Sequence, residues 1–313
     1  NKKWECLSLI FGKKKNSLIS FFLLPLSLFI QTLIALQSRY TERRKSSIPV
    51  ICVGNVYVGG TGKTPLSIEI VEILSKLNKK GAIVKKPYKE HADEFKLIES
   101  KRVALFKNSS RFQSINEAVK NKFDYVVLDD GYQDFSINKN LSILCFNEKQ
   151  LIGNGMTLPS GPLREPFSSI KRCQIIIING VKNLEFELQI KKISNSISIY
   201  YSEYVPTNIK QFRNKNLFAF AGIGNPENFF DLLEKNNLII TKKIAFPDHY
   251  KYSLIELEKI INFCMKNNLR LVTTEKDFFR IKHFKLPKIE YLGVKLEILD
   301  KNNFEKEIAK YLW

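Results

Sequence analysis

The sequence predicts an α/β protein with a parallel-rich sheet, and three observations support this class. Apolar, β-branched runs such as Ile48–Val53 are typical of buried strands. Segments with apolar residues at helical spacing, such as Ser67–Leu77, are typical of helices. The two kinds of segment alternate along most of the chain, as they do in βαβ units. With 313 residues the chain is long enough for two domains, and we place the boundary near Pro206.

The first element in chain order is a charge-free segment, Leu18–Leu36, with basic residues on both sides. A helix of this length approaches the thickness of the bilayer core at about 1.5 Å per residue. Pro25 would kink or split it, and its polar residues fall on one helical face: Ser20, Ser27, Gln31 and Ser38. We predict a membrane-associated helix, either spanning the bilayer or lying in the interface with basic anchors. A buried core helix is the alternative.

Residues 54–65 have the features of a phosphate-binding loop, because Gly-Asn-Val-Tyr-Val-Gly-Gly-Thr-Gly-Lys-Thr-Pro stands between a predicted strand and a predicted helix. Glycines let backbone N–H groups converge on an anion, and the helix N-terminus adds a favourable dipole. The usual motif has glycine where this chain has Tyr57. The predicted nucleotide contacts are Tyr57, Val58, Gly59, Gly60, Thr61, Gly62, Lys63 and Thr64.

Within this loop, Lys63 is predicted to reach the β- and γ-phosphates of ATP, and the Thr64 hydroxyl to bind Mg²⁺. The apolar strand 124–129 ends in two carboxylates, Asp129 and Asp130, and such a strand places an acid beside Mg²⁺ in P-loop proteins. Residues 158–166 are too rich in Pro and Gly for regular structure, and the embedded Arg164 is a candidate substrate-binding residue. The first half therefore predicts a P-loop NTPase-like α/β/α domain.

The second half again alternates predicted strands and helices, with Ser253 and Glu256 forming a capping box at the start of one helix. The segment Glu185–Tyr204 alternates polar and apolar residues, as hairpin or connecting strands would. We predict three parts. Residues 1–45 form the N-terminal helix with its basic flanks, 46–205 the nucleotide-binding domain and 206–313 a smaller C-terminal α/β domain.

The net charge of +19 favours anionic partners, namely nucleic acid, a membrane surface or a phosphorylated substrate. The lysines are dispersed rather than interleaved with aromatic residues, so no nucleic-acid binding is predicted. The five cysteines show no CxxC spacing and the three histidines lie far apart, which argues against a Cys or His metal site.

Taken together, several stretches resemble the tetraacyldisaccharide 4'-kinase family of lipid A biosynthesis. They are residues 53–65, Asp-Asp-Gly-Tyr-Gln at 129–133, Leu-Pro-Ser-Gly-Pro-Leu-Arg-Glu-Pro at 158–166, Ala-Gly-Ile-Gly-Asn-Pro at 221–226, Asp248-His249 and Thr-Thr-Glu-Lys-Asp at 273–277. Their order matches that of the family. The family's P-loop likewise lacks the first glycine, which accounts for Tyr57.

The resemblance implies transfer of the ATP γ-phosphate to the 4'-hydroxyl of a lipid disaccharide 1-phosphate, giving lipid IVA at the cytoplasmic face of the inner membrane. It makes Lys63 the phosphate clamp, Thr64 a Mg²⁺ ligand, and Asp129 and Asp130 the metal and active-site carboxylates. It also implies a catalytic Asp–His pair, matched by Asp93 and His249. A monomer is expected.

One segment departs from the family pattern, which usually has Ser-Arg-Gly-Tyr-Gly and a longer insert before the catalytic Asp. This chain has Lys-Lys-Pro-Tyr at 85–88 and runs almost directly into Asp93. A helix-capping role for Asp93 is therefore the alternative to catalysis. Because Asp93 and His249 come from different halves of the chain, we expect their pair to form across the two domains. Two other functions stay open: a P-loop protein acting on nucleic acid, and a membrane-anchored nucleotide-binding regulator.

Overall fold

The computed structural model describes residues 18–87 and 92–312. Its described residues form two compact units. The first comprises residues 18–87, 103–203 and 297–312, and the second comprises 92–102 and 204–296. The predicted boundary near Pro206 is therefore close to the observed one. Three segments differ from the prediction. Residues 18–45 belong to the first unit rather than forming a separate part, 92–102 belong to the second unit and 297–312 to the first.

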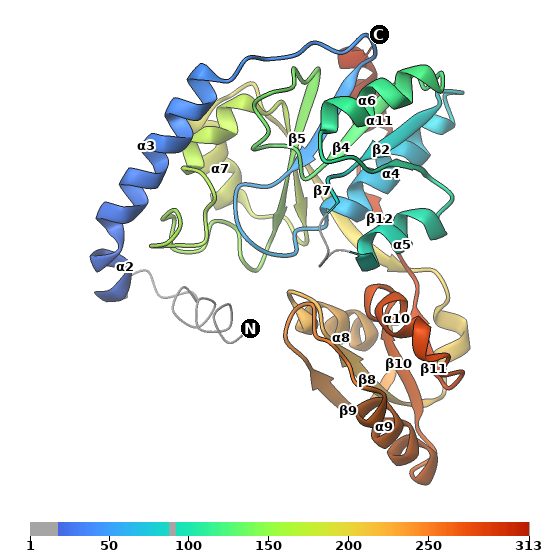
Figure 1. Cartoon of the computed structure of the whole chain (residues 1–313). Helices are drawn as coiled ribbons and strands as arrows, with labels where there is room; N and C mark the ends of the chain where they lie inside the picture. Colours follow the sequence, from blue (N-terminus) through green and yellow to red (C-terminus); the bar gives the residue numbers. More distant parts are fainter. Residues whose placement is uncertain (1–17, 88–91, 313) are drawn as a thin grey trace. The chain divides into compact units, whose positions relative to one another are not determined.

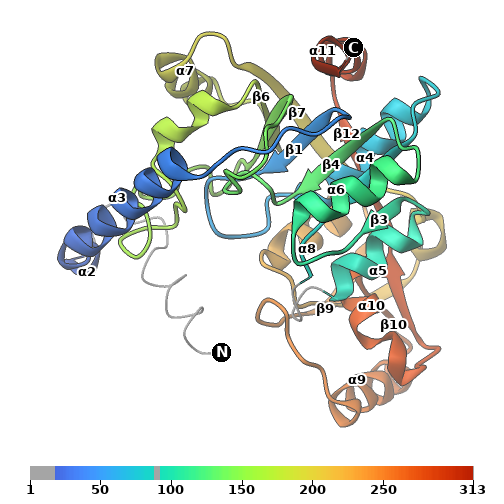
Figure 2. The ribbon, with the colours of Figure 1, turned by 45° about the horizontal axis from the view of Figure 1, so that its top comes forward.

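The first unit contains most of an eight-stranded sheet in the order β12-β7-β6-β5-β1-β4-β2-β3 (Figures 1 and 2). The pairs from β3 across to β7 are all parallel, which confirms the predicted parallel-rich sheet. The strands are β1 (Val50–Gly54), β2 (Gly81–Val84), β3 (Ala104–Phe106), β4 (Tyr125–Asp129), β5 (Leu141–Asn147), β6 (Ile175–Asn179), β7 (Ser198–Pro206) and β12 (Val294–Ile298).

Helices cover both faces of this sheet. Val50 and Cys52 are two residues apart on β1, so their side chains point to the same face of the sheet. Val50 joins a core cluster with α6 (Arg111–Lys120), and Cys52 joins one with α7 (Leu184–Ile193). α4 (Lys63–Ser75) packs against β1, β2 and β4, and α11 (Lys301–Leu312) against β5. Since successive side chains of a strand point to opposite faces, the fully buried β1 and β4 explain the continuous apolar runs seen in the sequence.

The second unit has a four-stranded sheet, β11-β10-β8-β9, with parallel pairing throughout. Its strands are β8 (Asn216–Ala221), β9 (Ile239–Ala245), β10 (Arg270–Thr274) and β11 (Ile289–Leu292). Leu217 and Ala219 face the cluster with α8 (Pro226–Lys235), whereas Phe218 and Phe220 face the cluster with α9 (Leu254–Lys266). The predicted capping box of Ser253 and Glu256 is present. α10 (Glu275–Ile281) and α5 (Ala92–Ser100) complete the unit.

One predicted element was wrong. Residues 185–193, interpreted as part of a strand pair, form most of α7. The period that decides is helical, because Phe186 and Ile190 are four residues apart and both buried. The Asn183 side chain caps this helix by accepting from the Phe186 N–H.

The N-terminal segment forms two helices, α2 (Leu18–Phe22) and α3 (Leu24–Tyr40), and the break next to Pro25 matches the predicted split. The polar stripe of α3 turns toward the protein. Ser27 Oγ donates to the Thr157 carbonyl at 3.0 Å and to Ser160 Oγ at 2.7 Å, and Gln31 Nε2 donates to Thr157 Oγ1 at 2.6 Å. Among the described residues, no helix has both the length and the apolar character needed to cross a membrane.

Candidate active site

The phosphate-binding loop joins β1 to α4, as predicted. Gly62, the N-cap of α4, has a φ of 87°, and Gly59 has a φ of 140°. Residues other than glycine rarely adopt these backbone conformations. Tyr57, which replaces the usual first glycine, buries its ring against Phe146, and its hydroxyl accepts from the Asn147 N–H at 3.1 Å. The Tyr57 side chain is therefore part of the core.

Two cations converge on Asp130, which follows β4. Lys63 Nζ lies 3.6 Å from Asp130 Oδ1, and Arg164 Nη1 lies 2.9 Å from the same atom. Burial alone would raise the pKa of Asp130, but Lys63 and Arg164 outweigh burial and hold that pKa at about 2. Burial lowers the pKa of Lys63, and Asp130 opposes this shift. The cluster places two positive groups beside the loop that is predicted to hold phosphates.

Asp129, the last residue of β4, contacts the first turn of α4. Its Oδ2 accepts from Thr64 Oγ1 at 2.8 Å and lies 2.5 Å from Lys85 Nζ. Its Oδ1 is buried and accepts no hydrogen bond from the described residues. A hydroxyl and a carboxylate with an unused oxygen are the hard ligands that Mg²⁺ prefers. Thr64 and Asp129 therefore fit a magnesium ion. Asp130 is instead occupied by the two cations, which does not favour the predicted metal role of its carboxylate.

The Pro/Gly-rich segment around Arg164 runs alongside the phosphate-binding loop. The Val58 N–H donates to the Pro162 carbonyl at 2.9 Å, and the Arg164 N–H to the Val56 carbonyl at 2.7 Å. These bonds fix the Arg164 backbone, which allows its guanidinium to reach Asp130 and Gln133. The segment is thus held in place by the loop that it borders.

The second unit contains the predicted Asp–His pair. Asp93 Oδ2 lies 4.0 Å from His249 Nδ1, which is too far for a hydrogen bond. The expectation that the pair would form across the two domains is wrong, because α5 and its Asp93 belong to the second unit together with His249. Asp93 Oδ1 accepts from the Glu94 N–H at 3.0 Å, so the capping alternative is also partly met.

Arg280, which the sequence analysis missed, holds Asp93 in place. Its Nη2 lies 2.6 Å from Asp93 Oδ2, while its Nη1 donates to Asp277 Oδ1 at 2.7 Å and to the Gly222 carbonyl at 2.9 Å. Asp277 is fully buried, and burial raises its pKa against the opposing effect of Arg280. The available signal was the spacing, since a residue three positions after Asp277 on a helix lies on the same face.

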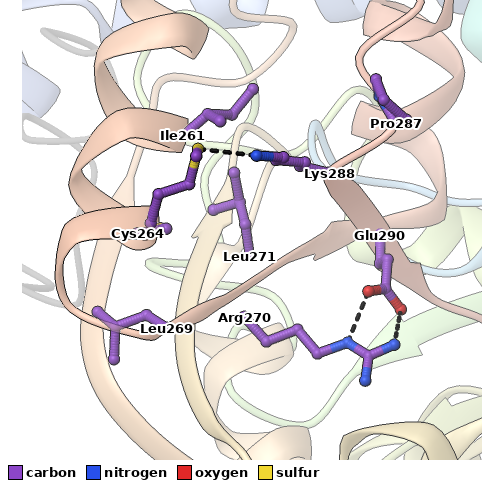
Figure 3. A pocket seen from close by; sticks show the side chains of 9 residues that line it. Ile261, Cys264, Leu269, Arg270, Leu271, Pro287, Lys288 and Glu290 are labelled. Atoms are coloured by element: carbon purple, nitrogen blue, oxygen red, sulfur yellow. Dashed lines mark hydrogen bonds and ion pairs between the residues drawn. The ribbon is translucent and has the colours of Figure 1, made fainter.

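A cavity of about 300 Å³ in the second unit lies at the N-terminal ends of β10 and β11 (Figure 3). Its polar groups are already paired. Arg270 binds Glu290 through two contacts of 2.6 and 2.8 Å, and Lys288 Nζ donates to Met265 Sδ. None of the predicted site residues lines it. The cavity is therefore not a candidate active site.

Comparisons with known proteins point to one family. The chain matches the family model "Tetraacyldisaccharide-1-P 4'-kinase" over residues 19–103 and 90–312. It is 40% identical over 300 residues to a tetraacyldisaccharide 4'-kinase from Pelagibacter ubique (strain HTCC1062), covering 95% of each chain. It is 30% identical over 318 residues to one from Rickettsia canadensis (strain McKiel), again covering 95% of each.

A solved structure supports the fold. LpxK from Aquifex aeolicus in complex with ATP aligns with a TM-score of 0.74 at 21% identity, covering 95% of this chain and 100% of that one. At this identity the likeness concerns the fold alone. The family model and the two relatives carry the assignment, and this chain belongs to the tetraacyldisaccharide 4'-kinase family.

Proposed function

We propose that the protein transfers the γ-phosphate of ATP to the 4'-hydroxyl of a tetraacyldisaccharide 1-phosphate, giving lipid IVA. The observation that carries this proposal is the phosphate-binding loop with Lys63 and Thr64 set beside the two carboxylates that end β4. Membership of the kinase family supplies the acceptor.

Phosphoryl transfer depends mainly on positioning and on neutralising charge at the transferred group. Lys63 would bind the β- and γ-phosphate oxygens, and Arg164, which shares Asp130 with it, would add a second positive charge. Thr64 and Asp129 would hold Mg²⁺, which when bound neutralises phosphate charge. The backbone N–H groups of residues 57–64 would bind the remaining phosphate oxygens.

At the acceptor, His249 would take the proton from the 4'-hydroxyl while the oxygen of that hydroxyl attacks the γ-phosphorus. The bond between that phosphorus and the β–γ bridging oxygen breaks, and ADP leaves. Asp93 would orient the imidazole through Nδ1, Nε2 would take the proton, and Arg280 would hold Asp93.

The protein would bind the membrane surface through α2 and α3. These helices direct Ser27 and Gln31 into the protein, so their apolar side chains are exposed, for example Phe22 at 83% and Phe29 at 61%. A helix with this reversed polarity suits the apolar region of a lipid surface. It would bring the enzyme to its acyl-chain substrate at the cytoplasmic face of the inner membrane.

The test is ADP release measured with and without a tetraacyl disaccharide 1-phosphate, together with mass spectrometry of the lipid product. We expect ADP release to depend on the acceptor, and one phosphate to be added at the 4'-position. ATP hydrolysis that is indifferent to the lipid would argue against the kinase. Nucleotide binding without any turnover would favour the alternative function, a membrane-anchored nucleotide-binding regulator.

A further inference from the structure

Lys85, the residue after β2, occupies an unusual place beside the proposed magnesium ligands. Its side chain is almost fully buried, and its Nζ lies 2.5 Å from Asp129 Oδ2 and 3.3 Å from Thr64 Oγ1. Asp129 Oδ2 also accepts from Thr64 Oγ1 at 2.8 Å. One ammonium thus contacts both groups that fit the metal.

The position of Lys85 follows from the sheet. β2 pairs with β4 in parallel, with Val84 opposite Leu128. The next residues along each strand are Lys85 and Asp129, so the register itself brings the lysine to the carboxylate. A short, buried ion pair of this kind is more than a chance surface contact, because a buried charge needs a partner.

A bound magnesium ion needs the same oxygens. It binds oxygen ligands at about 2.0–2.1 Å in near-octahedral geometry. The ammonium of Lys85 at its observed place would repel a divalent cation there, and it already uses one oxygen of Asp129. The ammonium is on a flexible stem of four carbons, so it can leave Asp129 if another anion attracts it.

We propose that Lys85 competes with Mg²⁺ for Asp129 and Thr64, and that the phosphates of the nucleotide draw its ammonium away when metal and nucleotide bind together. This inference rests on the proposed function, since it concerns the same phosphate and metal site. In the metal-free protein Lys85 keeps Asp129 neutralised. In the nucleotide complex it adds positive charge at the phosphates. Lys85 thereby couples metal entry to nucleotide binding.

The test compares the wild type with Lys85→Gln, using calorimetric titration of ATP over a range of Mg²⁺ concentrations and in excess chelator. Glutamine keeps a donor for Asp129 without the charge. In Lys85→Gln we expect Mg²⁺ to bind more tightly and ATP in chelator to bind more weakly, each by about fivefold or more, the lower end of typical coupling free energies. The Mg²⁺ concentration for half-maximal effect should fall, because the competing cation is gone. The affinity for ATP in chelator should fall, because a positive charge is lost.

Lys86→Gln is the matched control. This neighbouring lysine is 4.0 Å from Asp134 and more than a third exposed, and it should leave the Mg²⁺ requirement unchanged. A second variant, Lys85→Met, guards against a local effect of the glutamine amide, and far-ultraviolet circular dichroism checks folding. If both Lys85 variants bind ATP with the wild-type Mg²⁺ requirement, the competition is refuted while the kinase proposal stands. If the wild type itself binds no ATP at any Mg²⁺ concentration, both proposals fail.

Discussion

Lys63 and Arg164 share one carboxylate oxygen of Asp130, and this arrangement separates the role of Lys63 in catalysis from its role in the fold. If Lys63 is removed, Asp130 keeps Arg164 as a partner at 2.9 Å. A buried carboxylate left without any cation would destabilise the fold, but Asp130 in the variant still has Arg164. A substitution at Lys63 can therefore be interpreted through chemistry rather than through unfolding.

We expect Lys63→Ala to lower kcat by about 10²-fold or more, the scale seen when one donor to a developing negative charge is lost. The thermal unfolding midpoint should change little, for the reason just given. Steady-state kinetics and calorimetry measure the two quantities on one preparation. A variant within about threefold of the wild-type rate, roughly 0.7 kcal/mol in barrier, would remove Lys63 from the phosphate clamp.

Asp93 and His249 should act as one unit if the pair is catalytic. Each alanine variant is expected to lower kcat by about 10²-fold, the scale of general-base catalysis, and the double variant should be scarcely worse than the poorer single. ATP affinity should stay near that of the wild type. Fully additive losses would refute the pair. An Asp93→Ala variant with normal kcat and a stability loss of about 1 kcal/mol would leave Asp93 as a capping residue only.

Arg280 is expected to act through Asp93, because its Nη2 binds Asp93 at 2.6 Å. Arg280→Lys should keep part of kcat that Arg280→Ala loses, since lysine retains the charge but lacks the planar guanidinium fork that binds Asp93 and Asp277. In an Asp93→Ala background, Arg280→Ala should cost little further kcat. An equal loss of kcat in both backgrounds would mean that Arg280 acts independently of Asp93.

At the scale of elements, α3 shows how a helix can be predicted while its orientation is not. The sequence indicated a helix from the charge-free run, a split at Pro25 and a polar stripe. It could not indicate that Ser27 and Gln31 bind Thr157 and Ser160, because these contacts join residues more than 120 positions apart. The contacts turn the polar stripe inward and expose the apolar residues.

The exposed face makes a direct prediction for membrane binding. The paired substitutions Phe22→Glu and Phe29→Glu should greatly reduce sedimentation of the protein with vesicles, since they place charges where apolar side chains would enter the lipid. Ser27 and its contacts are untouched, so ATP binding should persist. Leu188→Glu is the control, because Leu188 is a 63% exposed apolar residue on a different helix, α7. Undiminished sedimentation of the Phe22/Phe29 variant would place the membrane contact elsewhere.

Local chemistry explains which other elements could be predicted. The phosphate-binding loop, the two acids at the end of β4 and the capping box at Ser253 each depend on residues close in sequence, and each is present. α7 was missed because a short segment of alternating polarity fits a strand as well as a helix. The decisive feature was the burial of Phe186 and Ile190 on one face.

At the scale of the whole molecule, the second unit is discontinuous in sequence, and this explains the error about Asp93. α5 and Lys101, the residue after it, join this unit through ion pairs of Lys101 with Glu275 and of Glu94 with Lys276, which link positions 174 and 182 residues apart. Sequence position alone assigned α5 to the first domain. Only the three-dimensional contacts, which no local pattern reports, bring Asp93 to His249.

Net charge is also a property of the whole molecule, and it makes a prediction separate from that of α2 and α3. A charge of +19 should attract the protein to anionic vesicles over a distance set by the salt concentration. The Debye length is about 10 Å at 0.1 M salt and about 3 Å at 1 M. Binding by charge alone should therefore be lost at high salt, whereas binding by buried apolar side chains should persist.

We accordingly expect two components in vesicle sedimentation measured across this salt range. The wild type should bind anionic vesicles strongly at 0.1 M salt and keep a substantial bound fraction at 1 M. The Phe22→Glu, Phe29→Glu variant should still bind in part at 0.1 M through its remaining positive charge, and should be released at 1 M. Neutral vesicles should bind the wild type with little salt dependence, because only the apolar face contributes there. Complete release of the wild type at 1 M salt would show that charge alone holds it at the surface, and the exposed face of α2 and α3 would then need another partner.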